Sequence, residues 1–264
     1  MRPQRANPAA AAILSGFLLW LAAAPAPARG ADLSAQRVHE ILLAAAPGRP
    51  ADLSGKSLED LDLSNFNFSR ANLSRTNLFG AKLVGTDFTA ADLSGAKLDL
   101  AWIMRANFTA ANLSKASLLG LVVASGLDYS PKEAPTFKGA NFSGAHILAR
   151  LGRFDLRGAN FAGAKLGADR KNQSMGLMRT DLSGANLAGA NFSQADLGLA
   201  LLRFANLSGA NLRGADLSEA DLSGADLTGA DLTGANATEA DFGGSVLTNA
   251  RGLDAMIGRN SPTR

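Results

Sequence analysis

The most regular chemical spacing in this sequence belongs to four aspartates that follow one another at every fifth position: Asp216, Asp221, Asp226 and Asp231. Such a series can form an acidic binding surface or simply a solvated face. Other reactive side chains are scarce, because the chain has no cysteine and two histidines, His39 and His146. Neither histidine has a second ligand or a nucleophile at a recognised spacing. We therefore expect no catalytic, cofactor-binding or metal-binding residues and no enzyme.

These aspartates belong to a repeat in which leucine or phenylalanine recurs at every fifth position. Residues 51–123 carry an unbroken series from Leu53 to Val123, and a second series runs from Leu182 to Leu247. A period of five fits neither the 3.6-residue helix nor the alternation of a strand. A short fixed period is typical of a solenoid, in which each turn buries its apolar face against the next.

The large core residues indicate the size of one turn. Phe68, Phe88 and Phe108 are each four pentapeptides apart, and phenylalanines in a narrow core pack best above one another. Four pentapeptides per coil follow, which gives a square cross-section. Small and polar residues at the outward positions suit tight turns. About nine coils at a spacing of about 4.8 Å would make a rod on the order of 45 Å long.

The motifs ADLSG, ANLSG, ANFSG and ADLTG resemble those of the pentapeptide-repeat family, and they cover residues 51–250 with few departures. The resemblance implies an all-β fold, the right-handed quadrilateral β-helix.

Residues 1–30 have the pattern of a secretory signal peptide. Arg2 and Arg5 precede an apolar stretch at residues 9–24, which ends near the A-x-A pattern of residues 26–28. Sixteen apolar residues are few for a membrane span, so we expect no transmembrane span after cleavage. The alternative is an uncleaved anchor. The pattern predicts a periplasmic or secreted protein.

Both ends of the solenoid need covers, because open strand edges recruit other molecules. In residues 31–50 a short capping helix is predicted, with Ser34 as its N-cap, an apolar face and an end at Gly48. The apolar face comprises Val38, Ile41, Leu42 and Ala45. Residues 251–264 form a C-terminal cap or tail, in which four residues could cover the last coil: Gly252, Leu253, Met256 and Ile257.

The repeat is interrupted twice. A loop insertion at residues 124–136 contains Tyr129, the only tyrosine of the chain. The second repeat block, residues 137–250, loses one residue near Gly152 and contains an excursion at residues 167–179. Loops on rigid scaffolds often carry function.

Several apolar residues occupy positions where the repeat places polar ones. On a lattice of four pentapeptides per coil, one group would form an exposed patch beneath the 124–136 insertion: Phe79, Val84, Leu100, Trp102, Met104, Leu119 and Val122. A smaller group near the second excursion comprises Leu199, Leu201 and Phe204. Either each excursion folds back over its patch, since monomers rarely leave large apolar areas bare, or the patch binds a partner through Trp102 and Tyr129.

Charge varies along the chain. Residues 124–213 hold 6 acids and 11 bases, whereas residues 214–264 hold 8 acids and 3 bases. The basic middle and the acidic end are either solvated faces or binding surfaces. They also leave open a homodimer in which the acidic coils of one molecule contact the basic middle of another.

These observations predict an exported, non-catalytic scaffold that binds an unknown protein or envelope component through its loops and patches. The family resemblance implies an alternative, a DNA mimic that binds and protects DNA gyrase in the cytoplasm. The signal peptide and the basic middle argue against that role. Direct nucleic-acid binding is not expected, since the basic residues lack interleaved aromatics and no recognition helix is visible.

Overall fold

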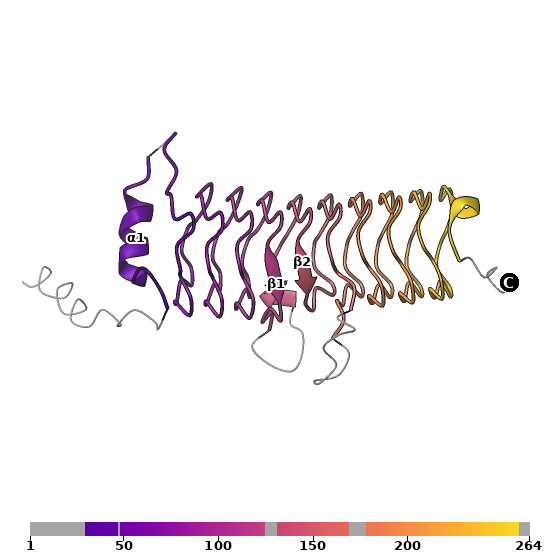
Figure 1. The fold of residues 1–264 in the computed structure, drawn as a ribbon, viewed down its shortest axis with the longest axis horizontal. Coiled ribbons are helices and arrows are strands. Elements are labelled where there is room, and N and C mark those ends of the chain that lie inside the picture. Colours follow the sequence, from indigo (N-terminus) through magenta and orange to yellow (C-terminus); the bar gives the residue numbers. More distant parts are fainter. Residues whose placement is uncertain (1–29, 47, 125–130, 169–177, 259–264) are drawn as a thin grey trace, which may run out of the picture.

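The chain folds as a straight rod of stacked coils (Figure 1). The computed structural model describes residues 30–46, 48–124, 131–168 and 178–258. The predicted signal peptide, except for Gly30, and Tyr129 lie outside the described residues. The rod is a right-handed quadrilateral β-helix with one short N-terminal helix, and the predicted fold class is confirmed.

Successive coils are joined by parallel backbone bridges, most of them between residues four pentapeptides apart. One line of bridges runs through ten residues in nine steps: Asp52, Asn72, Asp92, Asn112, Asn141, Asn160, Asn191, Asn211, Asp231 and Arg251. At about 4.8 Å per step the line is about 43 Å long. In the middle of the rod β1 (Ser117–Leu119) pairs in parallel with β2 (His146–Leu148).

Each coil turns four corners, and the sequence of the repeat explains how. An aspartate or asparagine precedes the central apolar residue, and its Oδ1 accepts a hydrogen bond from the backbone N–H two positions later. In the turn at Asp226, for example, the distance between Thr228 N and Asp226 Oδ1 is 2.9 Å. The next residue at the corner adopts a positive φ, which is +68° at Gly229. Glycine adopts this conformation without steric cost, so the short polar residue and the glycine together close the turn.

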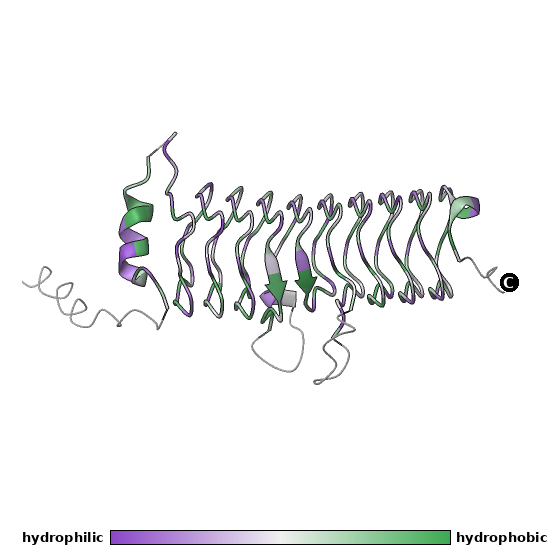
Figure 2. Cartoon of the chain, in the orientation of Figure 1, coloured by the Kyte–Doolittle hydropathy of each residue, from purple (hydrophilic) through white to green (hydrophobic). Residues whose placement is uncertain are grey.

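The central residues fill the interior as the four-pentapeptide lattice predicts. Phe68, Phe88, Phe108 and Phe137 form a stack with ring centroids 5.3, 4.8 and 4.8 Å apart. All four are fully buried, as are the alanines two positions before most centres. Figure 2 shows hydrophilic and hydrophobic residues alternating along the coils. Along the described coils the core is therefore filled by leucine, phenylalanine and alanine side chains.

The four sides of the rod are named here after the first coil. Face 1 carries Leu53, face 2 carries Leu58, face 3 carries Leu63 and face 4 carries Phe68. The 124–136 insertion lies between faces 3 and 4 and lengthens one coil to 29 residues, the separation of the bridged pair Asn112 and Asn141. The 167–179 excursion lies between faces 2 and 3. Both interruptions therefore border face 3.

The N-terminal end is closed by α1 (Ala35–Leu43). Ser34 caps this helix by accepting a hydrogen bond from Arg37 N at 3.2 Å, and Val38 is fully buried against the first coil. The predicted end at Gly48 is wrong. The helix ends at Leu43, because the chain then turns through a bridge between Ala46 and Arg49 to enter the first coil, and Ala45 is left exposed.

The C-terminal end has a slighter cover, the short helix η3 (Leu253–Ala255). Leu253 and Met256 pack against the core, as predicted, whereas Ile257 is exposed. A third short helix, η2 (Pro131–Glu133), lies where the first insertion returns to the rod. Within the described ranges, no helix has the length and hydropathy needed to span a membrane.

Candidate binding face

Exposed apolar side chains gather on one side of the rod. Seven large apolar side chains are exposed among the described residues, and three of them, Leu43, Val246 and Ile257, lie at the two ends. The other four lie on face 3 or at its corners: Leu100, Trp102, Met178 and Phe204. The sequence suggested two separate patches, but the structure places both groups on the same face.

Backbone conformation marks the same face independently. Among the described residues, the large apolar side chains with a positive φ are Leu100 at +60°, Leu199 at +63° and Phe204 at +54°. All three lie at corners that border face 3. A left-handed conformation costs an ordinary L-residue roughly 1–2 kcal/mol, and Phe204 recovers little of this by burial, because 74% of its surface is exposed.

Trp102 lies at the centre of the first apolar group. It bridges Lys82 on one neighbouring coil and Val122 on the other, and 40% of its surface is exposed. Beside it, Leu100 projects from the corner with 48% of its surface exposed. Trp102 and Leu100 therefore present accessible apolar surface, as in the alternative in which the excursion does not fold back over them.

Phe79 and Leu119 flank this pair at the corner between faces 2 and 3. Both are partly buried. The ammonium group of Lys97 lies over the ring of Phe79, 4.8 Å from its centroid. The Leu119 N–H donates to Asp99 Oδ1 at 3.0 Å. These two residues are a partly covered rim of the apolar group.

The expectation that Met104 is exposed is wrong, since only 6% of its surface is accessible. The neighbouring Arg105 N–H donates to the carbonyl oxygen of Glu133 at 2.8 Å. The returning end of the first insertion, η2, thus stacks on the turn that contains Met104. The interpretation in which the insertion covers the patch holds for Met104 and does not hold for Trp102.

The second apolar group lies four coils further along face 3. It comprises Leu201, whose bridge joins it to Asp181, with Leu199 and Phe204 at the adjoining corners. The ring of Phe204 lies over Gly224 on the next coil, so close that a methyl group at Gly224 would clash with it. Four coil spacings of about 4.8 Å separate Trp102 from Leu201 by about 19 Å.

Basic residues share face 3 with these apolar groups. Six exposed cations lie on the face or at its borders between the second and seventh coils: Lys82, Arg105, Arg150, Arg153, Arg179 and Arg203. Arg203 pairs with Asp221 on the following coil. The acidic residues on the bridge line of the face are Asp62 in the first coil, Asp181 in the sixth, and Asp221 and Asp241 in the last two, so cations outnumber acids in the middle coils. The middle of face 3 is therefore both apolar and basic.

The four aspartates of the acidic coil occupy four different faces, as their five-residue spacing predicts. Asp221 bridges Asp241 on the next coil. Each carboxylate caps its own turn, and Asp231 also lies 3.3 Å from Arg213 and 4.0 Å from Arg251. Hydrogen bonds from the side chain and backbone of Thr228 lower the pKa of Asp226. The described residues contain no cluster of histidine, aspartate and glutamate suited to a metal ion. Partner binding by these aspartates stays a prediction.

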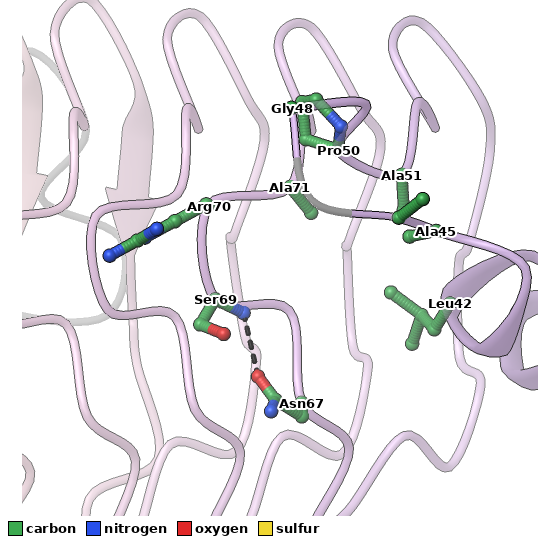
Figure 3. Close-up of a pocket in the computed structure, with 10 residues that line it drawn as sticks. Leu42, Ala45, Gly48, Pro50, Ala51, Asn67, Ser69, Arg70 and Ala71 are labelled. Atoms are coloured by element: carbon green, nitrogen blue, oxygen red, sulfur yellow. Dashed lines mark hydrogen bonds between the residues drawn. The ribbon is translucent and has the colours of Figure 1, made fainter.

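A cleft of about 420 Å³ lies between α1 and the first two coils (Figure 3). Leu42, Pro50 and Arg70 are among the ten residues that line it, and Asn67 Oδ1 accepts a hydrogen bond from Ser69 N at 2.9 Å. The lining contains no histidine and no carboxylate. It offers no pair of groups for acid–base or nucleophilic chemistry.

Comparison with protein families gives one match. The model for pentapeptide repeats matches in eight copies, over residues 57–95, 71–109, 180–218, 197–234 and 215–251. No curated protein matches the chain.

Several solved structures are similar in part. A pentapeptide repeat protein involved in heterocyst differentiation regulation, HetL from the cyanobacterium Nostoc sp. strain PCC 7120, is 29% identical over 78% of this chain and 90% of its own, with a TM-score of 0.31. The plasmid-mediated fluoroquinolone resistance protein QnrB1 is 22% identical over 76% and 90%, with a TM-score of 0.46. A thylakoid-lumen pentapeptide repeat protein from Arabidopsis thaliana is 27% identical over 55% and 66%, with a TM-score of 0.25. Likenesses of this degree carry no argument about function.

Proposed function

The chain belongs to the pentapeptide-repeat family, and from this premise we propose that it is an exported, non-catalytic scaffold that binds a protein or an envelope component on face 3. The observation that supports this proposal is the position of the exposed apolar side chains. Away from the two ends of the rod, every large apolar side chain that is exposed among the described residues borders this one face.

The identity of these residues supports binding rather than chance exposure. Tryptophan and arginine are enriched at binding hot spots, and Trp102 shares face 3 with Arg105 and Arg150. The apolar residues also depart from the repeat, which places asparagine, aspartate, serine or glycine at these positions. Since Leu100 and Phe204 adopt a positive φ, a glycine in their place would relieve strain. Their presence is therefore not explained by the stability of the rod.

The proposed location rests on residues 1–30, with their basic start, short apolar stretch and A-x-A end. Export would place the rod in the periplasm or outside the cell. A DNA mimic that protects gyrase needs a continuous acidic surface in the cytoplasm. The charges near the acidic coil do not favour that role, because Asp221 and Asp231 are paired with arginines.

Cell fractionation combined with affinity capture tests this function. The full chain, tagged at its C-terminus, is expected in a processed form outside the cytoplasm, where it captures one specific partner. The variant Trp102→Ala is expected to keep the rod folded and to lose that partner. The matched control is Asn72→Ala, a change on face 1. Unprocessed protein in the cytoplasm, or equal capture by Trp102→Ala and wild type, would overturn the proposal.

A further inference from the structure

We propose that face 3 is the surface by which the rod lies against an anionic lipid bilayer. This inference rests on the proposed function and specifies the envelope component as the membrane itself. It draws on three properties of the face, which are its straightness, the kind of side chains that project from it and the sign of its charge.

The shape of face 3 suits a planar partner. Its parallel bridges run from Asp62 to Val122 and again from Arg150 to Asp241, and the Trp102 group and the Leu201 group project from the same side of a straight rod. They are about 19 Å apart, with cations between them. A bilayer surface can contact both groups at once. The cleft lined by Arg70 lies at the N-terminal end of the rod and not on this face.

The side chains suit the interface between water and lipid. Tryptophan is enriched at membrane surfaces, and leucine and phenylalanine enter the boundary between headgroups and acyl chains. On face 3 these are Trp102, Leu100 and Phe204, all exposed. Leu100 and Phe204 occupy corner positions with a positive φ and are exposed there. The structure thus holds apolar groups out from the plane of the face, where a lipid surface would receive them.

The charges around these groups suit anionic headgroups. Lys82 is bridged directly to Trp102 on the neighbouring coil, and Arg150 lies on the same face between the two apolar groups. Both are exposed. The acidic residues on the bridge line of the face are Asp62, Asp181, Asp221 and Asp241. Asp181 is bridged to Arg150 on the neighbouring coil, and Asp221 pairs with Arg203. The excess of cations in the middle coils of the face would orient the middle of the rod towards a negative surface.

The two tryptophans of the chain make a local test feasible. They are Trp20, in the predicted signal peptide, and Trp102. In the full chain with Trp20→Phe, fluorescence reports Trp102 alone, and the N-terminal apolar stretch contributes no emission of its own. With vesicles of equimolar phosphatidylcholine and phosphatidylglycerol, we expect a shift of Trp102 emission to shorter wavelength and quenching by brominated lipid.

Charge and apolar variants in this background separate the contributions. Lys82→Glu with Arg150→Glu is expected to weaken vesicle binding at least roughly tenfold. The matched control, Arg75→Glu with Lys115→Glu, makes the same change of charge at two exposed positions beside face 1 and should bind like the parent. Leu201→Ser with Phe204→Ser should reduce quenching at Trp102, although these residues lie four coils away.

The outcomes are decisive in both directions. Unchanged Trp102 emission with anionic vesicles, or equal loss in the face 1 control, would overturn the lipid proposal. If this occurs while Trp102-dependent capture of a protein persists, the membrane inference fails and the scaffold function stands. Loss of both would overturn the scaffold function as well.

Discussion

The side-chain amide of Asn191 donates a hydrogen bond to Oδ1 of Asn160 over 2.9 Å, although 31 residues separate them. The same contact recurs between Asn211 and Asn191 at 3.0 Å, where the separation is 20 residues. The ladder continues along face 1 through five asparagines and ends on an aspartate: Asn211, Asn191, Asn160, Asn141, Asn112 and Asp92. The line of hydrogen bonds on face 1 is thus continuous past both insertions, which border face 3.

Because the ladder passes the second excursion without a change of geometry, the excursion should be dispensable for the rod. Deleting residues 169–179 would make the spacing of Asn160 and Asn191 equal to that of Asn191 and Asn211. We expect the free energy of unfolding to change by no more than about 1 kcal/mol, the scale of loop-closure entropy. Denaturant unfolding followed by circular dichroism measures this. A loss of the folded rod would show that the excursion holds the coils together.

The ladder itself should contribute to stability. Asn191→Ala removes one donor and the acceptor of two hydrogen bonds, those from Asn211 and Ser193. We expect a loss of about 1–3 kcal/mol in the free energy of unfolding, because Asn160 and Asn211 lose partners in a partly buried line. The control is Asn186→Ala on face 4, where Asn186 caps its turn at 3.4 Å. Equal losses of unfolding free energy at the two positions would mean that the hydrogen bonds between coils add no stability beyond that of capping the turn.

The aromatic core should be the most sensitive element. Phe161 is fully buried between Phe142 and Phe192, with centroid distances of 4.8 and 4.7 Å. Phe161→Ala should cost about 3–5 kcal/mol in the free energy of unfolding, since a narrow stack cannot collapse into the cavity. Phe161→Leu, the residue most common at such centres, should cost clearly less. Urea titration of the two variants measures both losses of stability. A larger loss for Phe161→Leu than for Phe161→Ala would contradict the stabilising role of the aromatic stack.

Stability should fall in acid. Hydrogen bonds from Thr228 lower the pKa of Asp226, and those from Thr233, followed by Arg213, lower the pKa of Asp231. A carboxyl whose pKa is lower in the folded state stabilises the fold above its ordinary value of 3.8, and this contribution is lost as the pH falls through the folded value. The variant Asp226→Asn with Asp231→Asn should therefore be less stable than wild type at pH 7.

The same pair of proteins provides the test of sign. Near pH 2 the difference in unfolding free energy should be smaller than at pH 7, because the contribution of the wild-type carboxylates is progressively lost as the pH falls below the ordinary value and through the lowered folded value. Thermal unfolding at the two pH values measures it. If the difference in unfolding free energy is the same at both pH values, the ionisation of these carboxyls does not contribute to stability, and only the shape and hydrogen bonding of the side chains do.

Much of this molecule follows from its period of five. The four-pentapeptide spacing of Phe68, Phe88 and Phe108 correctly predicts that their rings stack, and the spacing of Asp221 and Asp241 correctly predicts neighbouring coils. These succeed because every inward residue of a solenoid contacts its equivalent one coil away. In this fold, residues repeated at the four-pentapeptide spacing therefore contact each other in the tertiary structure.

The failures occur where the period is broken. The burial of Met104 depends on the carbonyl of Glu133, which the regular four-pentapeptide lattice does not place beside Arg105. The asparagine ladder and the shared position of Trp102 and Leu201 on face 3 need the lengths of the interrupted coils, 29, 19 and 31 residues. Allowing for these lengths in the sequence would have aligned the asparagines on one line. Gly48 is not the helix end, because entry into the first coil decides where α1 stops.

The central claim, that this rod functions through face 3, is tested most directly by site-specific photo-crosslinking in the exporting cell. A photoreactive phenylalanine analogue replaces Trp102 in one variant and Asn72, on face 1, in another. We predict adducts with a specific protein or with lipid at position 102 and none at position 72. The same adducts at both positions, or none at position 102 in the folded, exported protein, would contradict the account.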